Sequence, residues 1–161
     1  MGRVEKENYY LDIAQTVAER STCLRRRYGA IIVRNDEIIA TGYNGAPRGR
    51  KNCVDLNYCT REAMNIPSGQ RYELCRSVHA EANAIISAAR RDTLGSTLYM
   101  ACTDPATGAL IPNSTSCTMC RRQIINAGIQ RVVIRDTPTD YRVVEVEEWI
   151  REDDSLPPGQ I

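Results

Sequence analysis

The pattern of apolar and polar residues predicts three helices along the chain. Residues 8–20 carry apolar side chains at helical spacing, at Tyr10, Leu11, Ile13, Ala14, Val17 and Ala18. Residues 78–91, VHAEANAIISAARR, are rich in alanine and favour a helix. Residues 117–127 predict a third helix that stops at Gly128, because glycine suits the backbone position that follows a helix.

Short apolar runs between these helices predict strands. YGAIIVR (28–34) and EIIATG (37–42) flank the turn-forming pair Asn35-Asp36, which predicts a β-hairpin. Further strands are predicted at residues 97–101, 131–135 and 142–146. The order helix, hairpin, helix, strand, helix, strand is typical of an α/β domain whose central sheet is covered by helices.

Length and composition are those of an ordinary globular protein. The 161 residues suit one domain, which we place at residues 1–150 and follow with a tail at 151–161. A net charge of +1 argues against a protein that coats nucleic acid, because such proteins are strongly basic. The chain has no apolar run of the ~20 residues that span a membrane and no signal-peptide core near its start, so we expect a cytoplasmic protein without a membrane partner.

Cysteine and histidine residues mark a candidate metal site. Seven cysteines in a reducing compartment point to metal binding or catalysis before disulfides. His79, the one histidine, opens a predicted helix, and the one C-x-x-C motif, Cys117–Cys120, opens another. Cysteines at i and i+3 share one face of a helical turn, and helix N-termini favour the thiolates that zinc requires. One imidazole and two thiolates leave the fourth position of a tetrahedral zinc open for water, as in catalytic sites.

Glu81 suits the remaining role in such a site. Bound zinc lowers the pKa of its water to about 7, and a nearby carboxylate can take that proton and return it to the substrate. His-x-Glu followed by Cys-x-x-Cys is the signature of zinc nucleobase deaminases. We therefore predict a Zn²⁺-dependent hydrolytic deaminase with His79, Cys117 and Cys120 as ligands and Glu81 as acid and base.

Each motif alone has a plainer explanation. A C-x-x-C also occurs in redox motifs and structural zinc sites, and a histidine or glutamate at a helix start is often a cap or a partner of the helix dipole. The combination is more specific, because each motif opens its own helix. Two alternatives stay open: a deaminase of another nucleobase, free or in RNA, and a non-catalytic zinc module that binds nucleotides or a partner protein.

The sequence resembles the deoxycytidylate (dCMP) deaminases of the cytidine deaminase superfamily over roughly residues 8–146. The matching stretches are residues 20–33 (RSTCLRRRYGAIIV), 42–49 (GYNGAPRG), 79–85 (HAEANAI), 117–120 (CTMC) and 124–128 (IINAG). The resemblance implies a three-layer α/β/α fold with a mixed sheet of about five strands, a homo-oligomer, and hydrolysis of dCMP to dUMP and ammonia. It also implies a sugar contact at Asn44 and links the GYNG-x-P stretch to a nucleotide triphosphate effector.

Two features depart from the family pattern. Ser116 stands where a proline usually precedes the C-x-x-C motif, and its hydroxyl can cap the helix instead. The loop of residues 103–116 is much longer than expected. Because this loop must border the predicted site, we expect it to influence the choice of substrate.

Substrate contacts are predicted among the loop residues near the strand ends. Arginine grips phosphate through two parallel hydrogen bonds, and the candidates are Arg25, Arg26, Arg27, Arg48 and Arg50, with Arg26 and Arg48 favoured. The plainer explanation for any one of them is a solvated basic surface. Tyr141 is a candidate for packing on the base, and Ala80, between His79 and Glu81, completes the predicted contacts.

Four further cysteines surround the long connection of residues 42–72. Such a long loop usually needs something that fastens it, and a second, structural zinc could be held by Cys23, Cys53, Cys59 and Cys75. Some relatives carry a second zinc near these positions, which favours this hypothesis. The alternative is that the four thiols pack as small apolar groups, as we expect for Cys102 at the end of a predicted strand.

Overall fold

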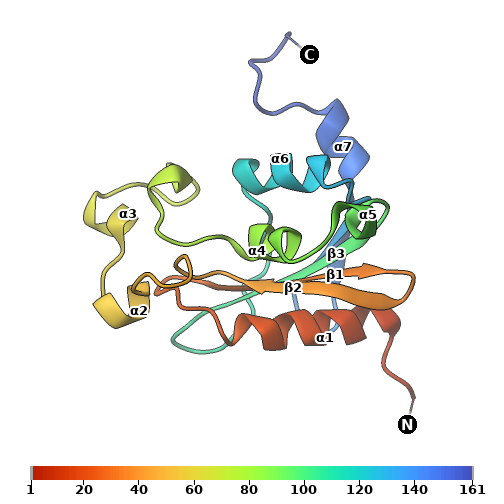
Figure 1. Ribbon diagram of the computed structural model, residues 1–161, viewed down its shortest axis with the longest axis horizontal. Helices are drawn as coiled ribbons and strands as arrows, with labels where there is room; N and C mark the ends of the chain where they lie inside the picture. Colours follow the sequence, from red (N-terminus) through yellow and green to blue (C-terminus); the bar gives the residue numbers. More distant parts are fainter. Residues whose placement is uncertain (1, 161) are drawn as a thin grey trace.

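The computed structural model describes residues 2–160, and within them the strands form a mixed sheet in the order β2-β1-β3-β4-β5 (Figure 1). The strands are β1 (Arg27–Arg34), β2 (Glu37–Tyr43), β3 (Thr97–Thr103), β4 (Arg131–Arg135) and β5 (Tyr141–Glu145). Neighbouring strands are antiparallel except β3 and β4, which are parallel. A parallel pair needs a crossover connection, which here contains helix α6 (Thr118–Asn126).

Helices cover both faces of this sheet. Helix α1 (Lys6–Ala18) lies on one face, and α4 (Ala80–Ile86), α6 and α7 (Val146–Arg151) lie on the other (Figure 1). Alternate side chains of β1 therefore enter two separate cores. Ile31 and Val33 pack in the cluster that contains α1, and Ala30 and Ile32 pack in the cluster that contains α4 and α6. The predicted three-layer α/β/α fold is confirmed.

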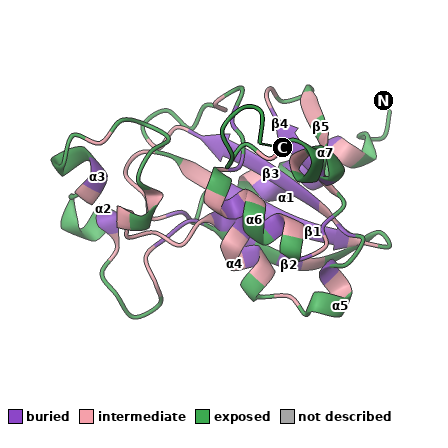
Figure 2. Cartoon of the chain, turned by 90° about the horizontal axis from the view of Figure 1, so that it is seen from above, coloured by how far each residue is buried: buried purple, intermediate pink, exposed green. Residues whose placement is uncertain are grey.

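The predicted hairpin of β1 and β2 is also present. Asn35 and Asp36 both adopt positive φ values, 51° and 61°, which match the twist of a tight two-residue hairpin turn. The three inner strands of the sheet, β1, β3 and β4, are buried along nearly their whole length (Figure 2). This buried centre gives the helices that carry the candidate site a rigid base.

Helix α4 approaches β2 unusually closely at Gly42. A Cβ atom at this position would collide with the backbone of Ala80 and Ala84. On the opposite face Gly29 has the same relation to α1, where a Cβ would meet the backbone of Ala14 and Ala18. Glycine at position 42 therefore sets how closely the start of α4 can lie to the sheet.

The prediction of a single helix at residues 78–91 is wrong in one respect: the structure has two helices there. Helix α4 ends at Ile86, and a second short helix, α5 (Arg90–Thr93), follows Ala89, whose backbone is extended. Tertiary contacts explain the break: Arg90 donates to the carbonyl of Asn126, and Thr93 Oγ1 donates to the carbonyl of Ala127 at 2.7 Å. These contacts hold α5 against the end of α6, so they outweigh the helix preference of the alanines.

The long connection after β2 contains short helices and projects from one end of the sheet (Figure 1). Its elements are α2 (Cys53–Leu56), α3 (Thr60–Ala63) and the 3₁₀-helix η1 (Tyr72–Leu74). An antiparallel bridge between Gly45 and Val78 closes it at its base, with backbone hydrogen bonds of 3.1 and 2.7 Å. Among residues 2–160, no helix has the length and apolar character needed to cross a membrane.

Candidate active site

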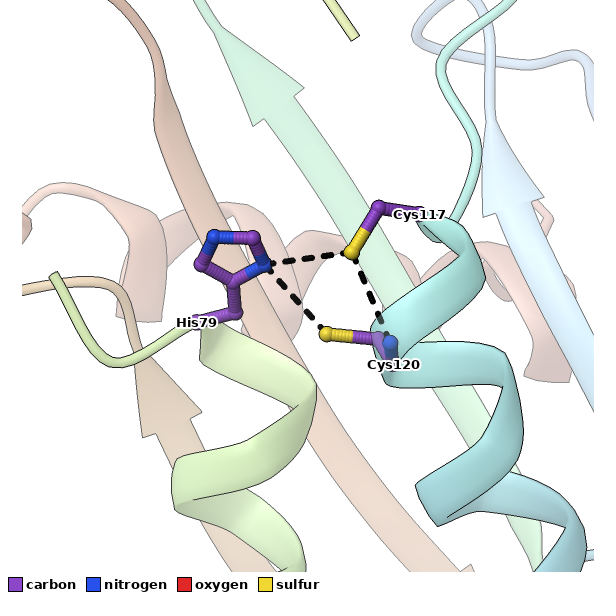
Figure 3. Close-up of side chains that lie close together, drawn as sticks. All are labelled: His79, Cys117 and Cys120. Carbon is purple, nitrogen blue, oxygen red and sulfur yellow. Dashed lines mark hydrogen bonds between the residues drawn. The ribbon is translucent and has the colours of Figure 1, made fainter. Parts of the chain in front are cut away.

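The N-termini of α4 and α6 bring a histidine and two cysteines together. His79 is the N-cap residue of α4, and Cys117 is the N-cap residue of α6, whose Sγ accepts the backbone N–H of Cys120 at 3.5 Å. The Nδ1 atom of His79 lies 3.5 Å from Cys117 Sγ and 3.3 Å from Cys120 Sγ (Figure 3). Within residues 2–160, these three side chains are the group whose ligand atoms all lie within 4.8 Å of one another.

The ionisation of this group suits a divalent cation. Hydrogen bonds from the thiol of Cys120 and from His79 lower the pKa of Cys117 to about 4 in spite of its burial. Burial lowers the pKa of His79, but hydrogen bonds to Cys117 and Cys75 outweigh it and raise the pKa to about 10. The hydrogen bond to Cys117, together with burial, raises the pKa of Cys120. Cys117 is therefore a thiolate between a protonated His79 and a protonated Cys120. Zinc binds such a set of donors by displacing the two protons.

Glu81 lies in the first turn of α4 and is 4% exposed. Burial raises the pKa of its carboxyl group, and its hydrogen bonds and the charge of His79 oppose that rise. A carboxyl group with a raised pKa can hold a proton near neutral pH and release it again. Glu81 is therefore a buried carboxyl group whose affinity for a proton is raised.

A cavity joins this group to the surface of the long connection. His79, Glu81 and Cys117 line its floor, and the remaining lining comes from the β1–β2 end of the sheet, the connection and the segment before α6. These lining residues are Cys23, Arg25, Arg26, Tyr28, Asn44, Cys59, Arg61, Ser68, Tyr72, Cys75, Ser77 and Thr115. A recess with buried acid–base groups at its base and arginines in its wall is suited to an anionic small molecule.

The structure places Asn44 and Arg26 at this cavity. Asn44 Oδ1 accepts hydrogen bonds from Ser21 Oγ at 2.5 Å and from the backbone N–H of Tyr28 at 2.9 Å. Its Nδ2 donates to the carbonyl of Arg26 at 3.0 Å. The Asn44 amide is therefore held firmly in one orientation, and one of its N–H groups has no partner in these contacts.

Two of the predicted substrate contacts, Tyr141 and Arg48, lie away from the cavity, and the side chain of a third, Ala80, is buried between two residues that line it. Tyr141 is on the α1 side of the sheet, where its hydroxyl donates to Glu5 Oε1 at 2.6 Å. Arg48 is exposed in a turn and does not line the cavity, and Ala80 is 1% exposed and packs in the core. Tyr141 begins β5 on the α1 side of the sheet and Arg48 lies in an exposed turn, so the structure does not bring these two side chains to the cavity.

Arg61 and Tyr72 form a part of the cavity wall that the sequence did not reveal. The guanidinium of Arg61 lies 4.2 Å from the centre of the Tyr72 ring, and the Tyr72 ring meets the His79 ring edge-on at 5.1 Å. Arg61 is 8% exposed, and its Nε and Nη2 donate to the carbonyls of Gln70 and Pro67 at 3.0 and 3.3 Å. No pattern in the connection distinguishes these two residues, because loop folding alone brings them to the site.

The four cysteines that surround the long connection lie near one another, because the other three affect the pKa of Cys53. The pKa of Cys53 is raised by burial and by the charges of Cys23, Cys75 and Cys59. In residues 2–160, however, their sulfur atoms do not form a group as close as that of His79 with Cys117 and Cys120. Cys102 is fully buried, and burial raises its pKa to about 11, as expected for a packing residue.

The fold and the site together define an α/β domain in which a buried carboxyl group lies beside three residues that could hold a metal ion. The chain belongs to the family described as the cytidine and deoxycytidylate deaminase zinc-binding region, which matches residues 4–136. The matched range includes His79, Glu81, Cys117 and Cys120.

Relatives of this chain include deoxycytidylate deaminases. The one from Mycobacterium phage D29 is 36% identical over 138 residues, which cover 83% of this chain and 96% of that protein. The one from Schizosaccharomyces pombe is 34% identical over 127 residues, covering 79% of this chain but 36% of that protein. The chain therefore spans nearly all of the phage relative and about a third of the yeast relative.

Solved structures give the same fold. The dCMP deaminase of cyanophage S-TIM5, in complex with dCMP and dUMP, has a TM-score of 0.57 and 28% identity over 84% of this chain and 85% of that one. Cytidine deaminase from Burkholderia pseudomallei has a TM-score of 0.56 and 16% identity over 89% and 95% of the two chains. The second likeness concerns the fold alone.

Proposed function

We propose that the chain is a zinc-dependent hydrolytic deaminase that converts dCMP and water to dUMP and ammonia. The observation that carries this proposal is the buried carboxyl group of Glu81 in one cavity with the ligand set of His79, Cys117 and Cys120. A purely structural zinc site has no need of an acid at its side. The deoxycytidylate deaminases among the relatives and the dCMP and dUMP complex of the cyanophage enzyme support this choice of substrate.

His79, Cys117 and Cys120 would hold the zinc. Their donor atoms lie within 4.8 Å of one another, and one thiolate with one imidazole and a second thiol matches the ligands that zinc prefers. When bound with an open fourth position, zinc supplies a water of lowered pKa at neutral pH. The helix N-termini that carry these ligands help to keep the sulfurs ionised.

Glu81 would move the protons of the reaction. Its carboxylate takes a proton from the attacking water, and its carboxylic acid gives protons to the ring nitrogen and then to the departing amine. Burial suits both tasks, because it raises the pKa of the carboxyl group towards the working pH.

The wall of the cavity supplies contacts for the rest of a nucleotide. Arg25, Arg26 and Arg61 are the arginines of the lining, and we assign the monophosphate to this group. One amide N–H of Asn44 takes no part in the contacts described above, and it could donate a hydrogen bond to a sugar hydroxyl. The net charge of +1 suits a small anionic substrate better than a polynucleotide.

A second, structural zinc is part of this proposal. Burial first, and then the neighbouring thiols of Cys23, Cys75 and Cys59, raise the pKa of Cys53, and this proximity supports a shared site that would fasten the long connection. Purified protein should then contain two zinc ions per chain, and Cys59→Ala should contain one. A wild-type protein with one zinc ion per chain would refute the second site. The cytoplasmic location, the homo-oligomer and the boundary at residue 150 stay predictions.

Ammonia release from a panel of nucleotides tests the substrate. The panel comprises dCMP, CMP, deoxycytidine, cytosine, and adenosine and guanine nucleotides, with zinc-loaded protein at neutral pH. We expect the highest kcat/KM for dCMP and a large loss for deoxycytidine, because the arginines then lack their phosphate. A higher kcat/KM for any adenine or guanine compound would contradict the proposal.

A further inference from the structure

The segment Ser114–Ser116 forms part of the cavity wall directly before the metal ligand Cys117. Thr115 lines the cavity, and its neighbours Ser114 and Ser116 are 4% and 1% exposed. The long loop that precedes this segment doubles back along β3, where Leu110 forms a bridge with Thr103. The segment is therefore the point at which this long loop reaches the candidate active site.

Arg121 on α6 holds the last two residues of the segment. Its Nε donates to the carbonyl of Ser116 at 3.0 Å, and its Nη2 donates to Thr115 Oγ1 at 3.4 Å. At the other end of the segment, Arg142 Nη2 donates to the carbonyl of Ser114 at 2.5 Å. Two arginine side chains thus fix the three residues from both ends.

The C-terminal part of the chain holds Arg121 in turn. Arg121 Nη1 lies 3.1 Å from Asp154 Oδ2, and the guanidinium lies 4.9 Å from the centre of the Trp149 ring. Figure 1 shows α7, which carries Trp149, beside α6. Residues 151–161 were expected to be a tail outside the domain, yet Asp154 contacts a side chain that reaches the cavity wall.

Stability alone does not account for this arrangement. The side chains of Arg121 and Asp154 are 25% and 54% exposed, and ion pairs of such exposure contribute only about 0–1 kcal/mol to folding. The same guanidinium, however, uses Nε and Nη2 in contacts with the cavity-wall segment, and Nη1 and one face in contacts with the C-terminal part of the chain. A rigid guanidinium with several fixed donors is well suited to position backbone carbonyls.

We propose that Arg121 is a positioning residue for the substrate-contacting wall at Thr115 and that Trp149 and Asp154 act through it. The C-terminal segment then sets the affinity for the nucleotide. This inference rests on the proposed function, because it assigns the cavity to a nucleotide. The chemistry at Glu81 is not altered, so the effect appears in KM more than in kcat.

Steady-state kinetics with dCMP and amide hydrogen exchange test this role. Arg121→Gln, Asp154→Ala and Trp149→Leu should each raise KM, by about tenfold for Arg121→Gln, which loses hydrogen bonds from a charged donor. Trp149→Phe keeps an aromatic face for the guanidinium and should restore most of the affinity. Exchange in peptides that cover residues 113–117 should become faster in the same variants while zinc content is unchanged.

Controls separate this role from folding and from the proposed function. Lys6→Gln breaks an exposed ion pair with Asp36 on the other face of the sheet and should change neither KM nor exchange. Asp154→Ala added to Arg121→Gln should have no further effect, because both act through one guanidinium. A chain that deaminates no nucleotide refutes the proposed function, and exchange then decides the positioning role alone. Unchanged exchange in Arg121→Gln, or an unchanged KM in an active enzyme, overturns the inference.

Discussion

Replacing Gly42 with alanine should disturb the metal site from a distance. A Cβ at this position would overlap backbone atoms of Ala80 and Ala84, and backbone cannot move aside by changing rotamer. Helix α4 must shift by about 1 Å to restore ordinary contact, and shifts of that size can cost on the order of 100-fold in rate. Because His79 and Glu81 lie at the start of α4, both zinc affinity and turnover should fall.

Gly29→Ala is the matched control for this experiment. Its Cβ would meet the backbone of Ala14 and Ala18 on the opposite face, so it should destabilise the fold by a similar amount, about 1–3 kcal/mol. It leaves α4 in place. Urea unfolding measures the two stabilities, and competition with a chromophoric chelator measures the zinc dissociation constants. If Gly42→Ala bound zinc as tightly as Gly29→Ala, the claim that Gly42 sets the position of the site would be refuted.

Two further predictions concern stability. Arg142 lowers the pKa of the Asp136 carboxyl, so this group stabilises the fold above the ordinary carboxyl pKa of about 4, and the contribution is lost as the pH falls below it. Asp136→Asn should cost about 1 kcal/mol at pH 7, and its deficit in urea unfolding should shrink towards pH 3; a deficit that grew in acid would contradict this sign. Arg135 is 3% exposed and contacts Asp12 at 2.7 Å and the carbonyl of Pro138 at 2.8 Å. Arg135→Met should cost about 1–3 kcal/mol, because it removes hydrogen bonds from a charged donor, whereas a neutral result would show that these contacts contribute little.

The central sheet and the core of the site could be predicted because their signals are local. The runs YGAIIVR and RVVIR are apolar over the length of a strand, and both form strands that are buried in the sheet. His79 and Cys117 each lie at the start of a helix, so the motif and the helix pattern predict the same position for each residue. The motifs therefore identified the two helix starts, and the packing of α4 and α6 on the same face of the sheet brings the three side chains together.

Features that depend on tertiary contacts could not be predicted in this way. The break after Ile86 occurs in a sequence with high helix preference, and contacts with the end of α6 cause it. Tyr141 is the first residue of β5, and the face to which its side chain points depends on the pairing of β5 with β4, because a one-residue difference in register reverses the face. Loop folding brings Arg61 to the cavity, and the long side chain of Arg121 reaches the lining residue Thr115; neither leaves a periodic signal in the sequence.

The most direct test of the account is the turnover of dCMP by Glu81→Gln. Glutamine keeps the size of the side chain but cannot carry the protons, so kcat for ammonia release should fall by about 10²–10⁴-fold with the zinc content unchanged. Glu37→Gln, at an exposed position at the start of β2, should keep the wild-type rate. A Glu81→Gln protein that released ammonia from dCMP at the wild-type rate would contradict the assignment of this buried carboxyl group as the acid and base.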